Sequence, residues 1–168
     1  MTTDGLLLRP LRGVPAIKEG ADLAQETLDA LDRTGERLGA GDVLVYAQKI
    51  VSKAEGRGVA LNSVCPSARA IALAEQTGKD ARLVELILRE STDVLRQREG
   101  LLIVRHRLGL KLANAGIDAS NVDAGHVLLL PLDPDASAAR IRGDLRTRAG
   151  VDVGVLIIDS IGRPWRMG

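Results

Sequence analysis

The chain has 168 residues and a formal net charge of +1, with 45% hydrophobic but only 1% aromatic residues. This length favours one domain, or at most two small ones, around an aliphatic core. The balanced charge and scarce aromatic side chains argue against nucleic acid as a partner, and the single Cys65 excludes an internal disulfide framework. No signal peptide and no run of about 18 apolar residues is visible, so we expect a cytoplasmic protein without a membrane span.

The first half of the sequence alternates apolar runs with turn signals. The predicted elements are a strand over residues 6–8, a helix over 22–37, a strand over 43–47 and helices over 67–77 and 80–90. Ser67 and Asp80 can each cap the helix that follows, because a short polar side chain there accepts from the free amides of the first turn. Gly78 ends the first of these two helices.

The second half continues with both kinds of element. We expect strands over residues 101–105 and 110–113 joined by a turn, a helix capped by Asp135 or Ser137 that runs to about residue 149, and a strand over 153–158. Strands and helices do not alternate strictly, so the sequence predicts an α+β fold with a mixed sheet and flanking helices.

The polar segment over residues 113–122 lies between two apolar runs and contains a glycine, a carboxylate and two amides. Loops held between rigid elements are common sites of ligand binding. Asp159 likewise follows an apolar strand, so Asp118 and Asp159 are the natural pair for a Mg²⁺ site, since this ion often takes only one or two protein carboxylates. The alternative is that each aspartate only stabilises a turn.

Lys49 and Lys53 follow a buried strand and are candidates for contact with an anionic phosphate, although a solvated strand edge is an equally good interpretation. The sequence contains neither a Walker A motif nor a dinucleotide-binding glycine fingerprint. His106 and His126 have no metal-ligand spacing, and we expect both to be structural. No serine stands in a nucleophile-elbow motif, which gives a hydrolase triad little support.

Several ungapped motifs together resemble the coenzyme F420-0:L-glutamate ligase family. In this family's order they are VPAIKEG at 14–20, GDVLV at 41–45, IVSKAEG at 50–56, NAGIDASNV at 114–122, LDPD at 132–135 and DSIGRPWR at 159–166. The resemblance covers almost the whole chain. It implies a GTP-dependent enzyme that joins L-glutamate to the carboxylate of F420-0 through an acyl phosphate, with Mg²⁺ or Mn²⁺ and with K⁺ associated with activity.

The resemblance also implies roles for individual residues. Asp118 and Asp159 correspond to metal ligands, and Ser160 stands where the family commonly has a threonine that binds a second metal. Lys53 is expected to stabilise the transferring charge. The implied nucleotide contacts are Val14, Pro15, Ala16, Ile17, Gln48, Lys49, Lys53 and Asn121. Gln48 and Lys49 occupy a position that varies within the family.

Relatives are expected to continue beyond the Gly-Arg-Pro-Trp-Arg segment at 162–166, so residues 1–168 correspond to the N-terminal portion of the family. The missing portion would supply further nucleotide contacts and a glutamine metal ligand. The resemblance also predicts a homodimer. Two other interpretations stay open: a non-catalytic module that binds the nucleotide or the F420 precursor, and a metal-dependent phosphohydrolase that uses Asp159.

Overall fold

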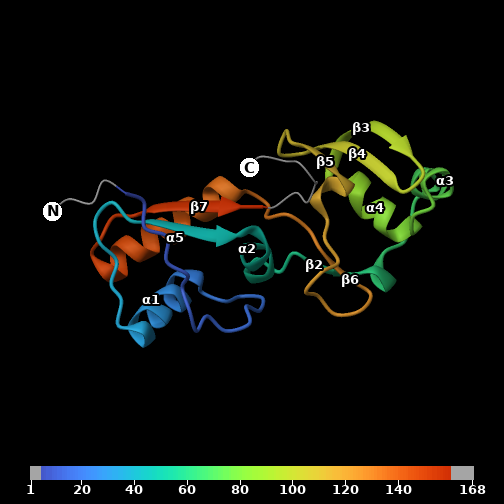
Figure 1. Cartoon of the computed structure of the whole chain (residues 1–168). Coiled ribbons are helices and arrows are strands. Elements are labelled where there is room, and N and C mark those ends of the chain that lie inside the picture. Colours follow the sequence, from blue (N-terminus) through green and yellow to red (C-terminus); the bar gives the residue numbers. More distant parts are fainter. Residues whose placement is uncertain (1–4, 160–168) are drawn as a thin grey trace.

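The structure is a computed structural model that describes residues 5–159, and it divides into two lobes and a joint (Figure 1). We call them the parallel lobe, the antiparallel lobe and the joint. The chain starts in the parallel lobe, passes through the joint into the antiparallel lobe and returns by the same route (Figure 1). The α+β class predicted from the sequence is confirmed, with parallel and antiparallel pairs in separate sheets.

The parallel lobe is built on two strands and three helices. Its elements are α1 (Leu23–Thr34), β1 (Val43–Ala47), α2 (Gln48–Ala54), α5 (Pro134–Ala149) and β7 (Gly154–Ile158). β1 and β7 pair in parallel, although more than 100 residues separate them in the sequence. One face of this sheet packs on the helices, where Tyr46, Val51, Ile141 and Leu145 form the core.

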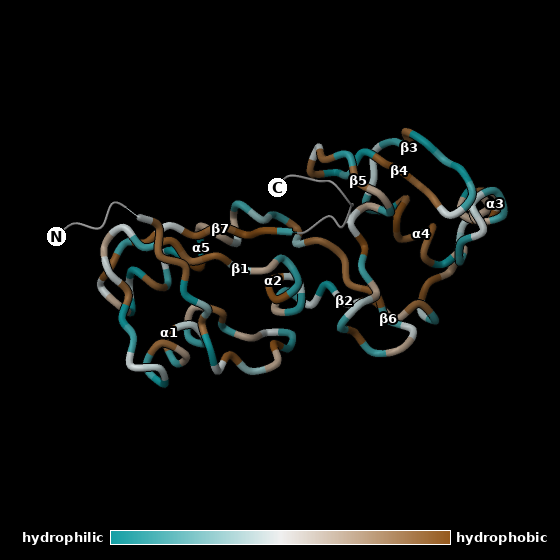
Figure 2. Tube along the Cα trace, viewed as in Figure 1, coloured by the Kyte–Doolittle hydropathy of each residue, from teal (hydrophilic) through white to brown (hydrophobic). Residues whose placement is uncertain are grey.

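The antiparallel lobe consists of α3 (Ala68–Thr77), α4 (Ala81–Arg89), β3 (Ser91–Arg98), β4 (Leu101–His106), β5 (Lys111–Ala113) and the short 3₁₀ turn η2 (Asn114–Gly116). The strands form an antiparallel sheet in the order β3-β4-β5. Leu102 and Val104 of β4 are fully buried against α3 and α4. In Figure 2 the central strand β4 is accordingly hydrophobic, whereas the edge strand β3 is largely hydrophilic.

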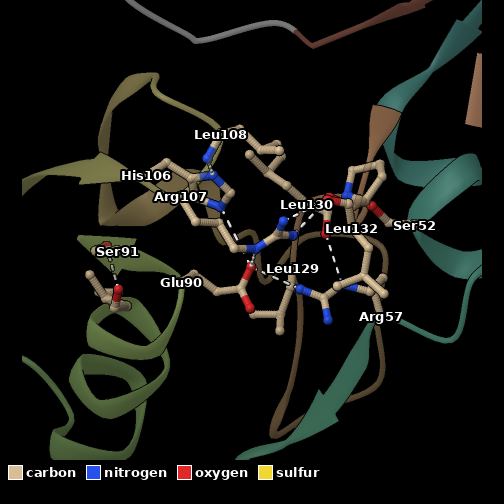
Figure 3. A network of polar contacts seen from close by, with 12 residues as sticks. Ser52, Arg57, Glu90, Ser91, His106, Arg107, Leu108, Leu129, Leu130 and Leu132 are labelled. Carbon is tan, nitrogen blue, oxygen red and sulfur yellow. Dashed lines mark hydrogen bonds and ion pairs between the residues drawn. The ribbon is translucent and has the colours of Figure 1, made fainter. Parts of the chain in front are cut away.

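The joint contains β2 (Gly58–Ala60), the 3₁₀ turn η1 (Leu61–Ser63) and β6 (His126–Leu128), with β2 and β6 paired antiparallel. Figure 3 shows the polar network beside it, in which the Glu90 carboxylate lies between the guanidinium groups of Arg57 and Arg107 at 2.8 and 3.1 Å. The same arginines donate to the main-chain carbonyls of Leu130 and Pro131 at 2.8 and 3.0 Å. The network therefore fixes the return segment to the antiparallel lobe.

Most predicted helices are confirmed, together with the residues that end them. Ser67 and Asp80 cap α3 and α4, and Gly78 adopts the left-handed conformation after α3. The helix predicted to run to residue 37 ends earlier, because Gly35 takes a φ of 68°. The predicted hairpin between β4 and β5 is also present.

Several expectations about elements were wrong or incomplete. Lys49 and Lys53 lie in the unpredicted helix α2 and not at the strand edge that was the alternative for them. Residues 6–8 form no strand, and their leucine side chains are exposed. Asp133 caps α5 in place of the predicted Asp135 or Ser137, and its carboxylate accepts from the Ala136 amide at 2.9 Å. The helix begins this early because Pro134 suits the first helical position. β3 was not predicted, since its many charged residues suit an edge strand but hide the alternating pattern.

Candidate active site

The candidate site lies where the two parallel strands end. Ala47, the last residue of β1, pairs with Ile158, the last residue of β7, so the start of α2 and Asp159 are adjacent. The carboxyl ends of parallel strands are a common place for ligands in α/β sheets. The side chain of Asp159 is exposed at this edge. Ser160, the predicted ligand of a second metal, lies outside the described residues.

Asp118 reaches this edge from the segment after η2, which pairs with β6 of the joint. Its carboxylate contacts the Lys49 ammonium in the first turn of α2. The carboxylate also accepts from Ser120, at 2.9 Å from the amide and 2.8 Å from the hydroxyl, while Lys49 donates to the same hydroxyl. The structure therefore brings Lys49 and Asp118, which sequence reasoning assigned to separate ligands, into direct contact.

The backbone around Asp118 is held in place on both sides. Its amide and carbonyl pair with Leu128 of β6 at 3.0 and 2.8 Å. Upstream, Asn114 and Ala115 both have positive φ angles, of 51° and 54°, which is rare for alanine and costs conformational energy. Gly116 is required next to them, because a Cβ there would lie 3.0 Å from the Leu130 side chain. The carboxylate is thus presented by a rigid turn.

The electrostatics of Asp118 suit a bound cation. Partial burial disfavours the charged carboxylate, but hydrogen bonds from Lys49 and Ser120 outweigh that effect and lower the pKa below its usual value. The Lys49 ammonium already occupies a cation position beside an anionic oxygen. Among the described residues no three His, Cys, Asp or Glu side chains cluster as a metal cage. The donors present fit Mg²⁺ or Mn²⁺ completed by phosphate and water.

Lys53 and Asn121 flank this contact. Lys53 lies one helical turn after Lys49, is partly exposed, and makes no ion pair within the part of the chain described. Asn121 is exposed in the loop after Asp118, with a left-handed φ of 56°. Gln48, by contrast, is buried and donates to Ser52 at 2.6 Å, so its amide is directed into the protein.

The segment predicted to contact the nucleotide borders a pocket of about 780 Å³. Val14, Pro15 and Ile17 line it, together with Val43 and Val45 of β1 and Ile50 of α2. The pocket therefore extends along β1 toward the turn that carries Lys49. Ile17 is also part of the core, whereas Val14, Pro15 and Ala16 are exposed.

The main chain beside this pocket has unused donors. Across residues 5–159, the amides of Val14, Ala16 and Ile17 donate no hydrogen bond. Backbone amides beside an apolar wall are among the polar groups that fix the orientation of a ligand in a pocket. Val14, Pro15 and Ile17 therefore line one pocket, and their contact with a nucleotide stays a prediction.

One site residue was missed. Ser120 orients the Asp118 carboxylate through two hydrogen bonds and also accepts from Lys49. The signal was present in the sequence, because an aspartate commonly accepts from the backbone amide two residues later. The two histidines are structural as far as the structure describes them: His106 is fully buried beside Glu90, and His126 is in β6.

Comparison with known proteins gives a consistent result. A sequence profile for F420-0:gamma-glutamyl ligase matches residues 13–168. The chain is 44% identical over 164 residues to the coenzyme F420:L-glutamate ligase of Methanothermobacter thermautotrophicus, which covers 98% of this chain and 65% of that protein. Proteins of the same name from Methanopyrus kandleri and Archaeoglobus fulgidus are 44% and 45% identical, over 97% and 95% of this chain. The chain spans less than two thirds of the length of these relatives.

No helix between residues 5 and 159 is long and apolar enough to cross a membrane.

Proposed function

The chain belongs to the F420-0:gamma-glutamyl ligase family, and we propose that it carries the nucleotide and metal site of an enzyme that attaches L-glutamate to F420-0. In this proposal GTP supplies the phosphoryl group. Asp118 and Asp159 would hold Mg²⁺ or Mn²⁺, Ser160 would bind a second metal, and K⁺ assists in balancing charge. The product belongs to the biosynthesis of coenzyme F420.

The observation that carries the proposal is the contact of Lys49 with Asp118 at the ends of β1 and β7. A cationic side chain and an oriented carboxylate at one sheet edge are suited to a phosphate chain and its metal, respectively. The pocket along β1 ends at the same turn, next to Ile50. Its volume of about 780 Å³ lies within the usual range for small-molecule sites.

The reaction requires an activated carboxylate, because a carboxylate does not react with an amine at neutral pH. The F420-0 carboxylate attacks the γ-phosphorus of GTP, the bond to the β-phosphate oxygen breaks, and an acyl phosphate and GDP form. The amine of glutamate then attacks the acyl carbon, loses a proton, and releases inorganic phosphate. Positioning and charge stabilisation supply most of the acceleration in such phosphoryl transfers.

Different residues of the chain bind the nucleotide and stabilise the transferring charge. Lys53 lies one turn beyond the contact of Lys49 with Asp118 and stabilises negative charge on the transferring group. Asp118 and Asp159 would hold the metal, which would supply positive charge to neutralise phosphate oxygens. The free amides of Val14, Ala16 and Ile17 orient the guanine base in the pocket, and Asn121 and Lys49 contribute further nucleotide contacts. The buried Gln48 contributes through its main chain.

The test is a mass-spectrometric assay with GTP, Mn²⁺ or Mg²⁺, K⁺, L-glutamate and F420-0. We expect a glutamylated product that depends on GTP and falls at least 100-fold in Asp118→Asn and in Asp159→Asn. Asp123→Asn, in the same loop but without a contact to Lys49, is the matched control and retains the activity.

The rival function is binding without turnover. The observation that favours it is the coverage of the relatives, because the match extends over 61–65% of their length in the first three comparisons. GTP or F420-0 binding without product would support that module and contradict the catalytic proposal. Phosphate release that needs neither glutamate nor F420-0 would support a phosphohydrolase.

A further inference from the structure

The contact between Lys49 and Asp118 has a consequence for metal binding. The ammonium touches Oδ2 of Asp118, which also accepts from the Ser120 hydroxyl, while Oδ1 accepts from the Ser120 amide. Both carboxylate oxygens are therefore in use. Within the described residues, Lys49 is the only side chain with a full positive charge that pairs with this carboxylate.

Oδ2 already accepts from the Lys49 ammonium and the Ser120 hydroxyl, so a divalent ion that binds this oxygen competes with the ammonium. Metal–oxygen distances of about 2.1 Å for Mg²⁺ would place the ion in the space that the ammonium fills, and two like charges a few ångströms apart repel strongly in a partly buried site. The side chains of Lys49 and Asp118 are about one third exposed, at 33% and 31%. Solvent therefore weakens the pair enough for it to be exchanged.

We propose that Lys49 acts as a resident counter-cation of Asp118, which the divalent metal displaces when the metal–nucleotide complex binds. The inference rests on the proposed function and adds a positioning role to it. Lys49 keeps the carboxylate in its binding orientation before the metal arrives. It also lowers the affinity for metal alone, so that the site fills with metal and nucleotide together.

The Lys49 side chain can move to a second position when the metal displaces it. Lys49 lies in the first turn of α2, and among the described residues the polar partners of its ammonium are Asp118 and Ser120, at the tip of a flexible four-carbon stem. A short rotation leaves the ammonium beside the same edge of the sheet, where the phosphates of a nucleotide would lie. An ion pair with phosphate thus replaces the ion pair of Lys49 with Asp118. Binding of the metal and binding of the nucleotide therefore favour one another.

The experiment measures Mn²⁺ binding without nucleotide, with the electron paramagnetic resonance signal of free Mn²⁺ as the readout. Lys49→Met removes the charge and keeps the stem, and we expect it to bind Mn²⁺ about tenfold more tightly than the wild type. Lys49→Arg keeps the charge and is expected to bind no more tightly than the wild type. Thermal unfolding of each variant checks that the fold is retained.

Lys53→Met is the matched control, because it removes the same charge one turn away without touching Asp118. We expect its Mn²⁺ affinity to stay within about twofold to threefold of the wild type. An equal gain in Lys53→Met would show a general charge effect and would overturn the proposal, as would Lys49→Met with unchanged or weaker Mn²⁺ binding.

Asp118→Asn separates this inference from the proposed function. Mn²⁺ binding that is lost in Asp118→Asn but unaffected by Lys49→Met would overturn only the role of Lys49. Mn²⁺ affinity that is the same in Asp118→Asn and in the wild type would contradict the metal site itself, and with it both proposals.

Discussion

At the scale of single residues, the contact between Lys49 and Asp118 joins two residues that are 69 positions apart in the sequence. The Asp118 carboxylate in this contact also accepts two hydrogen bonds from Ser120. Ligand carboxylates that are themselves hydrogen-bonded keep their orientation and bind metal more tightly. The geometry of the site is therefore sensitive to residues that would not touch the ligand.

We predict that Ser120→Ala weakens Mn²⁺ binding about tenfold while the carboxylate remains ionised at neutral pH. The reason is that Asp118 loses the hydroxyl donor at 2.8 Å but keeps the amide donor at 2.9 Å. A Mn²⁺ titration followed by electron paramagnetic resonance measures the effect. Ser63→Ala, a change of the same size in η1, is the control. Equal affinities in the two variants would show that Ser120 does not orient the ligand.

Lys53→Met should lower the affinity for GTP in the presence of Mg²⁺ by roughly tenfold, because a charge-assisted hydrogen bond to phosphate is lost. Isothermal titration calorimetry measures this change. Lys111→Met, which removes an exposed lysine from β5, should leave the affinity as it is. If both variants bind GTP like the wild type, Lys53 is not a phosphate contact.

At the scale of elements, the sequence predicted best where a local rule determines the structure. The caps Ser67 and Asp80 and the terminator Gly78 act through bonds to the nearest turn, so their neighbours alone identify them. The apolar run at residues 43–47 likewise gave β1. The apolar run at residues 6–8 gave no strand, since within residues 5–159 it pairs with no other segment.

The site followed the opposite rule. Asp159 lies at the edge where α2 begins because β1 pairs with β7, and the backbone of Asp118 is fixed by its bridge to Leu128 of β6. Neither pairing is visible in local spacing. The residue types suggested a phosphate and a metal, and the family motifs suggested the individual positions. The direct contact between Lys49 and Asp118 required the tertiary structure.

The cap of α5 gives a test at this scale. Asp133→Ala should destabilise the protein by about 1 kcal/mol, because the Ala136 amide loses its acceptor at 2.9 Å. Asp135→Ala, in the first turn but not the cap, should cost less than about half as much. Urea unfolding at neutral pH compares the two. A larger loss of stability in Asp135→Ala than in Asp133→Ala would indicate that Asp135 caps the helix, as first expected from the sequence.

At the scale of the whole molecule, Glu90 connects the lobes. Its side chain is 11% exposed, lies between Arg57 and Arg107, and through them fixes the carbonyls of the return segment (Figure 3). This network ties the antiparallel lobe, which carries the turn before Asp118, to the two segments of the chain that pass through the joint. Removing one member of a buried charge pair is costly, since it leaves the others unpaired.

We predict that Glu90→Gln destabilises the fold by about 3 kcal/mol at pH 7. Burial opposes ionisation of Glu90, but His106, Arg57 and Arg107 outweigh it and lower the pKa from 4.5 to about 2. Stability from this carboxylate is therefore fully present above pH 4.5 and is lost as the pH falls toward about 2.

Denaturant unfolding of both proteins between pH 7 and pH 2 measures this dependence. The difference between wild type and Glu90→Gln should shrink steadily below pH 4.5. The other acidic residues are common to both proteins, so their titration cancels in the comparison. A difference that is constant across this range would show that the charge of Glu90 does not stabilise the joint.

The central claim is that the site at the ends of β1 and β7 activates the carboxylate of F420-0 by phosphoryl transfer. The most direct measurement uses F420-0 labelled with ¹⁸O in that carboxylate, together with GTP, Mn²⁺ and L-glutamate. An acyl phosphate passes one carboxylate oxygen to phosphate, so we predict one ¹⁸O atom in the inorganic phosphate for each glutamylated product. Product accompanied by unlabelled phosphate would contradict the claim.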